Sequence, residues 1–236
     1  MIFVNGCSFS ETQKNHNNPM WKPWSDYLCD VYSPHGQFFN TALSSNGQGK
    51  ILDTTIEGIE SYQGKIEMAI IQFSAISRGY GKTYNDFVAQ VIESTNYQAL
   101  LHQEEYMLDS TGGVTSLTKY IDMLYYKSSL CKIIAIKNYL ENKKIPYLFF
   151  WGWQQITEEI CKDPAINSLL KKCYDGNWWR FGEHGGLSEW GIHQFGKDAA
   201  ILPEDFHPTT LVHSSFWENI IKPIILKNNI RISDVI

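Results

Sequence analysis

Short apolar runs alternate with helical periodicity along this chain, and that alternation limits its possible folds more than any other feature. The apolar runs predict strands at Met1–Asn5, Phe38–Leu43, Ile66–Phe73, Ile145–Trp151 and Ala199–Leu202. Apolar residues at helical spacing predict helices at Trp24–Tyr32, Ile51–Tyr62, Ser116–Asn142, Thr157–Cys173 and Thr209–Lys222. This order predicts an α/β fold with three layers, in which helices cover both faces of a parallel sheet of about five strands.

The length of the chain fits one domain with a substantial core. It has 236 residues, of which 43% are hydrophobic, and a chain of this size buries most of the surface that its unfolded form exposes. Two stretches, at about 79–115 and 156–197, follow the alternation poorly. We therefore expect a single domain over 1–236 with insertions at these two places.

Charge and cysteine content argue against several function classes. The formal net charge is −5, and the basic residues are scattered rather than clustered, so we expect no nucleic-acid partner. No apolar run approaches the roughly 20 residues of a membrane span, and no signal region opens the chain, which predicts a cytoplasmic protein without a membrane partner. The five cysteines include no CxxC pair, so we expect neither a metal nor a cofactor.

Polar residues follow each predicted strand, which places the expected chemistry at the carboxyl edge of the sheet. Ser8 follows the first strand, in Gly-Cys-Ser, and His207 follows the last one in Pro-Glu-Asp-Phe-His-Pro. A serine with a histidine base and an orienting carboxylate is the arrangement for nucleophilic acyl transfer. Ser8 alone would be a helix cap, but the opposite ends of the chain can meet at one sheet edge. Cys7 is expected to be buried packing.

Four segments in order resemble the conserved blocks of one hydrolase family. They are Gly6-Cys7-Ser8-Phe9-Ser10, the stretch from Asn40 to Ile51, the stretch from Ile70 to Arg78, and the stretch from Asp205 to His213. Together they resemble the SGNH/GDSL hydrolases, in the GCSF-type variant of phage-encoded and uncharacterised bacterial members. The resemblance implies a flavodoxin-like sheet and leaves the two insertions uncovered. For a phage-encoded member it implies the virion or the host-cell cytoplasm.

By this resemblance Ser8 is the nucleophile and His207 is the base. The family usually has an aspartate three residues before the histidine, where this chain has Glu204. Asp205 fits the DxH spacing of other SGNH-like proteins. We favour Asp205 as the triad acid, and Glu204 remains open.

The expected oxyanion hole departs from the family pattern. Ser45 stands where the second block has glycine, and Ser74 stands nearest to the asparagine of the third block. Asn46 or Arg78 could supply a donor instead. Losing one oxyanion donor costs about 2.7–4 kcal/mol, so the departures are compatible with a slow enzyme.

These observations predict a metal-independent serine esterase or deacylase that removes an O-acyl group, such as acetyl, from a carbohydrate or small molecule. The carbohydrate expectation rests on the aromatic segment 177–196, whose tryptophans could stack on sugar rings or fill a satellite core. Two alternatives stay open: a non-catalytic carbohydrate-binding or virion-associated module, and an O-acyltransferase with the same triad. The sequence does not indicate an oligomeric state.

Overall fold

A computed structural model describes residues 1–12, 21–74, 76, 113–174, 177–203 and 206–228. Its single five-stranded sheet has the strands β1 (Ile2–Asn5), β2 (Phe38–Asn40), β3 (Met68–Phe73), β4 (Tyr147–Trp151) and β5 (Trp178–Trp179). All neighbouring strands run parallel, in the order β2-β1-β3-β4-β5. The predicted parallel α/β fold is thus confirmed, with a flavodoxin-like strand order.

The strand order creates a switch point between β1 and β3. The chain runs from β1 outward to β2, then returns to β3 on the other side of β1 and continues outward to β5. In such sheets the crevice outside the carboxyl ends of the strands at the switch point is where ligands bind. All residues of β1 and β3 are buried, because helices cover both faces of these central strands.

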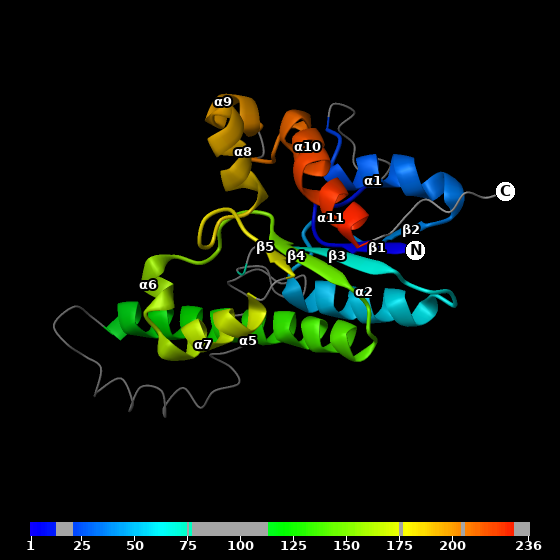
Figure 1. Cartoon of the computed structure of the whole chain (residues 1–236). Helices are drawn as coiled ribbons and strands as arrows, with labels where there is room; N and C mark the ends of the chain where they lie inside the picture. The colour runs from blue at the N-terminus through cyan, green and yellow to red at the C-terminus, as the bar shows by residue number, and fades with distance from the viewer. Residues whose placement is uncertain (13–20, 75, 77–112, 175–176, 204–205, 229–236) are drawn as a thin grey trace.

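Helices form a layer on each side of the sheet (Figure 1). One layer contains α2 (Gln48–Ser61), α5 (Gly113–Asn142), α6 (Glu158–Cys161) and α7 (Pro164–Cys173). The other contains α1 (Trp24–Tyr32), α8 (Leu187–Phe195), α9 (Lys197–Ala200), α10 (Thr210–Phe216), the π-helix η3 (Trp217–Ile221) and α11 (Lys222–Lys227). A short 3-10 helix, η2 (Ser33–His35), follows α1.

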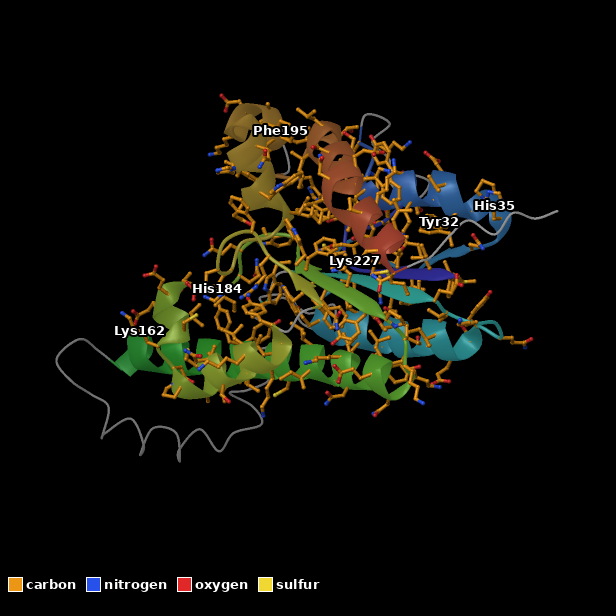
Figure 2. All side chains as sticks on the ribbon, viewed as in Figure 1. Tyr32, His35, Lys162, His184, Phe195 and Lys227 are labelled. Atoms are coloured by element: carbon orange, nitrogen blue, oxygen red, sulfur yellow. The ribbon has the colours of Figure 1, made fainter. Side chains whose placement is uncertain are left out.

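Each face of the sheet carries its own hydrophobic core, and side chains fill both spaces between sheet and helices (Figure 2). Alternate residues of one strand feed opposite cores: Phe3 packs with the α2–α5 layer, whereas Ile2 and Val4 pack with the layer of α1 and α10. This division follows from the period of two of side chains along a strand.

One predicted strand was wrong, and one predicted helix extends beyond its expected end. The fifth strand is the two-residue β5, not Ala199–Leu202, which instead ends α9 and forms an isolated bridge from Ile201 to Pro208. The last predicted helix continues past Lys222 in three parts, as α10, η3 and α11. The helix predicted at Thr157–Cys173 is divided into α6 and α7, because the side chain of Asp163 caps the start of α7. Most of the insertion expected at about 79–115 lies outside the described residues.

Among the described residues, no helix has the length and apolar character needed to cross a membrane.

Candidate active site

Ser8 and His207 lie in direct contact although 199 residues separate them in the chain. The Nε2 atom of His207 is 2.7 Å from the Oγ atom of Ser8, which is within the 2.6–3.2 Å reach expected of a nucleophile and its base. Ser8 follows β1, and its exposed fraction is only 5%. The structure therefore brings together the two residues on which the sequence prediction depends; their catalytic role stays a prediction.

A buried glutamine holds the turn that carries Ser8. The side-chain Oε1 of Gln72, on β3, accepts hydrogen bonds from the backbone N and the Sγ of Cys7 and from the Oγ of Ser10, each at 3.2 Å. A Cβ atom at Gly6 would lie 2.9 Å from both oxygens of Gln72, so the turn can approach β3 this closely only because residue 6 is glycine. The predicted packing role of Cys7 fits its complete burial.

Aromatic rings and backbone hydrogen bonds fix the position of His207. Its ring lies edge-on to Phe9 and Trp21, with centroids 5.0 and 5.8 Å away. The carbonyl oxygen of His207 accepts a hydrogen bond from the backbone N of Leu202 at 2.8 Å. Phe206, just before it, has a φ of 59°, a left-handed conformation that turns the chain sharply.

Three of the predicted site residues are not described by the structure. Glu204 and Asp205, the two candidates for the triad acid, lie outside the described residues, and so does Arg78. The choice between the two acids therefore stays as the sequence leaves it.

The segment expected to supply oxyanion donors lies beside the nucleophile turn. The Nδ2 of Asn46 donates to the carbonyl oxygen of Gly6 at 3.2 Å, which uses one of its two amide hydrogens. Ser45 is exposed and has a φ of 66°, a left-handed conformation that glycine adopts without strain and other residues adopt at about 1–2 kcal/mol.

Ser74 directly follows β3 and is completely buried. Its carbonyl oxygen accepts a 2.7 Å hydrogen bond from the Nε2 of Gln48, at the start of α2. This bond ties the end of β3 to the helix that follows the Ser45 segment. The role of Ser74 as an oxyanion donor stays a prediction.

Sequence reasoning missed a buried acid beside the site. Glu11 accepts hydrogen bonds at Oε2 from the backbone N of Ser44, at 2.7 Å, and from the Ser44 hydroxyl. These bonds fasten the segment containing Ser45 to the turn containing Ser8. A glutamate directly after Gly-Cys-Ser-Phe-Ser was the available signal, because a buried carboxylate needs hydrogen-bond donors.

A second histidine, His213 on α10, lies behind the site. It is fully buried, and among the described residues neither ring nitrogen has a hydrogen-bond partner. Its ring centroid is 6.2 Å from that of Phe9 and 5.7 Å from that of Trp21, the same two rings that flank His207. Burial lowers the pKa of His213 to about 3, and the nearby His207 adds to this shift.

Two tryptophans of the aromatic segment 177–196 lie in the cores rather than on a sugar-stacking surface. Trp178 and Trp190 are 6% and 7% exposed. Trp178 stacks on Phe73 in one core, and Trp190 packs edge-on to Phe216 in the other. The satellite-core interpretation is therefore correct for these two tryptophans.

A pocket of about 410 Å³ adjoins the base. The residues that line it are Phe9, Trp153, Ser188, Ile192, Lys197, Ile201, Phe206 and His207. Its walls come from the nucleophile turn, from the end of β4, and from α8, α9 and the segment that leads to α10. Most of this lining is apolar.

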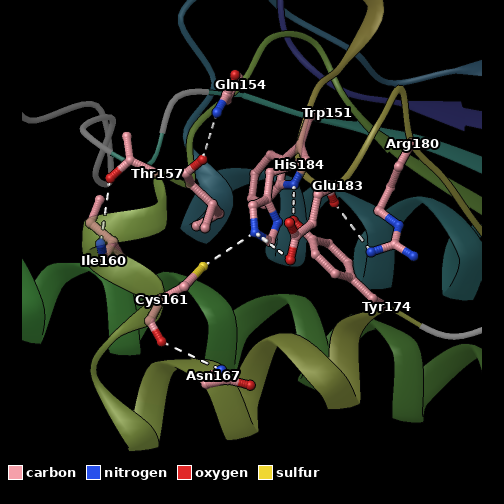
Figure 3. A network of polar contacts seen from close by, with 11 residues as sticks. Trp151, Gln154, Thr157, Ile160, Cys161, Asn167, Tyr174, Arg180, Glu183 and His184 are labelled. Carbon is pink, nitrogen blue, oxygen red and sulfur yellow. Dashed lines mark hydrogen bonds and ion pairs between the residues drawn. The ribbon is translucent and has the colours of Figure 1, made fainter.

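A thiol and an imidazole also meet elsewhere, between α6 and the segment after β5 (Figure 3). The Sγ of Cys161 is 3.2 Å from the Nε2 of His184. Burial raises the pKa of the Cys161 thiol, and burial lowers the pKa of His184. Both shifts favour the neutral pair, whereas a cysteine nucleophile needs a thiolate. The Cys161 thiol is therefore poorly suited to act as a second nucleophile.

In the part of the chain that the structure describes, no group of three histidine, cysteine, aspartate or glutamate side chains could hold a metal ion.

No family model matches this sequence, and neither does any curated protein. Among solved structures, AlinE4, an esterase of the SGNH-hydrolase family, aligns over 96% of this chain and 95% of its own, with 14% identity and a TM-score of 0.46. A catalytic mutant of Axe2, an acetylxylan esterase from Geobacillus stearothermophilus, aligns over 98% and 94%, with 10% identity and a TM-score of 0.43. Protein YXIM from Bacillus subtilis aligns over 98% of this chain and 57% of its own, with 13% identity and a TM-score of 0.50. At these identities the similarity describes the fold alone.

Proposed function

We propose that this protein is a metal-independent serine esterase of the SGNH type, acting on an O-acyl ester of a small molecule or carbohydrate. The observation that carries the proposal is the 2.7 Å contact between Ser8 Oγ and His207 Nε2. The contact lies at the switch point of a parallel sheet, where ligands of such folds bind. The four ordered motifs of the SGNH resemblance support the same assignment.

In the proposed reaction, His207 Nε2 takes the proton of Ser8 as Oγ attacks the ester carbonyl carbon. The bond from that carbon to the alcohol oxygen then breaks, and His207 gives its proton to the departing alcohol. Water next attacks the acyl-serine while His207 takes a proton from it. The acid leaves and Ser8 recovers its proton, so the cycle closes without a metal or cofactor.

The remaining roles follow the sequence prediction. Asp205 is proposed to orient His207, with Glu204 as the alternative. Backbone N–H groups of Ser8 and Ser45, together with Ser74, are proposed to stabilise the oxyanion, with Asn46 or Arg78 as substitutes. The hydrogen bonds from Ser44 to Glu11 support this assignment, because they hold the Ser45 segment against the nucleophile turn.

Hydrolysis of p-nitrophenyl acetate tests the proposal directly. We expect release of p-nitrophenolate at a rate proportional to the concentration of folded protein and unaffected by a metal chelator. The rate is measured by absorbance, with heat-unfolded protein as the control. A folded preparation that hydrolyses this ester no faster than the unfolded control would count against an esterase.

A further inference from the structure

We propose that the pocket beside His207 binds the alcohol part of the substrate, and that this alcohol is an apolar, ring-sized group with an acidic substituent. The inference rests on the proposed esterase function and adds a substrate class to it. It assigns the carboxylate or similar anion of the alcohol to Lys197.

The position of the pocket decides which part of the ester it receives. His207 is part of its wall, and His207 is the group that gives a proton to the departing alcohol. The Ser44–Asn46 segment, where the acyl oxygen is expected to lie, is not part of this wall. When Ser8 attacks an ester whose carbonyl oxygen faces the Ser44–Asn46 segment, the alcohol oxygen faces His207. The alcohol therefore lies in the pocket.

The lining determines the chemistry of the group that fits. Five of the eight described lining residues are apolar: Phe9, Trp153, Ile192, Ile201 and Phe206. Phe206 and Ile192 are 74% and 37% exposed, so a bound apolar group would remove substantial apolar surface from water. A sugar would instead leave many hydroxyl groups against apolar walls without hydrogen-bond partners. The volume of about 410 Å³ lies in the range of small-molecule pockets.

Lys197 is the one lysine or arginine among the described residues that line this pocket. It is exposed at the start of α9, and no ion pair involves it among the described residues. Its ammonium group is on a flexible stem, and it is therefore available to an anion held in the pocket. Asp198 follows it in the chain but is not among the described residues that line the pocket.

The test compares three esters in wild type and in Lys197→Glu. Phenyl acetate carries no charge, 3-carboxyphenyl acetate carries a carboxylate on the alcohol, and monophenyl succinate carries one on the acyl group. We expect Lys197→Glu to lower kcat/KM about tenfold for 3-carboxyphenyl acetate, because an attraction is replaced by a repulsion. The other two esters are expected to change less than about twofold.

The matched control is Lys227→Glu, which changes the net charge equally at an exposed position outside the pocket. This variant is expected to have kcat/KM values within about twofold of wild type for all three esters. Equal losses for the two carboxylate esters, or no loss with Lys197→Glu, would overturn the proposed assignment of the alcohol. If wild type hydrolyses none of the esters, the esterase function itself fails, and the two failures are thereby distinguished.

A second variant tests the apolar wall. We expect Phe206→Ala to lower kcat/KM for phenyl acetate at least about fivefold while leaving methyl acetate nearly unchanged. An equal loss for both esters would mean that Phe206 positions His207 rather than contacting the alcohol, and would overturn this part of the proposal.

Discussion

The Ser8→Ala variant is expected to lose at least about 10³-fold in kcat for p-nitrophenyl acetate. Without Oγ, no covalent acyl intermediate can form, and only the oxyanion donors and binding would still assist water. The change removes a small side chain, so the fold should persist. Steady-state rates, with circular dichroism and urea unfolding to confirm folding, measure the effect.

Two further variants make this result specific to the Ser8–His207 pair. His207→Gln is expected to lower kcat by about 10²–10⁴-fold, the usual contribution of a general base. Cys7→Ala is expected to retain most of the activity, because Cys7 contacts Gln72 and is completely buried. A Cys7→Ala variant as inactive as Ser8→Ala, in a folded protein, would contradict the assignment of Ser8.

The stability of the protein is expected to fall in mild acid because of His213. Burial lowers the pKa of His213 from 6.5 to about 3 in the folded state. Between these two values the unfolded chain binds a proton that the folded chain does not, so the free energy of unfolding decreases as the pH falls. The loss is about 1.4 kcal/mol per pH unit below 6.5, or about 2.7 kcal/mol at pH 4.5.

A His213→Leu variant isolates this contribution. It replaces two buried nitrogens, which have no hydrogen-bond partner in the described part of the chain, by apolar atoms, and this change is close to neutral for stability at pH 7.5. Urea unfolding followed by tryptophan fluorescence at pH 7.5, 5.5 and 4.5 should show a shallower pH dependence than wild type. The exposed His35→Gln variant serves as the control and should follow wild type. If the free energy of unfolding fell equally with pH in His213→Leu and in wild type, His213 would not be the cause of the acid destabilisation.

The sequence predicted the layers of this fold well because the central strands are continuous apolar runs. β1, β3 and β4 are buried on both faces and lie within one or two residues of their predicted bounds. β5 was missed because it consists of two residues, too few to show a period. Ala199–Leu202 is short and apolar like a buried strand, but its Ala200 completes a helical turn by donating to the carbonyl of Gly196.

The sequence predicts those residues of the candidate site that follow the strands of the sheet. Ser8 and His207 could be paired because the carboxyl ends of parallel strands share an edge. Gln72 and Glu11 could not be assigned partners, because their hydrogen bonds join segments that only the folded chain brings together. A lone glutamine inside a buried strand was the visible signal, since such an amide requires partners.

The central claim is that Ser8 is a nucleophile activated by His207, and covalent labelling with a fluorophosphonate tests it most directly. In this reaction Ser8 Oγ bonds to phosphorus and fluoride leaves. The account predicts one adduct per folded chain, located by mass spectrometry on Ser8 and absent from heat-unfolded protein and from Ser8→Ala. A folded protein that acquires no adduct, or acquires it on another residue, would contradict the account.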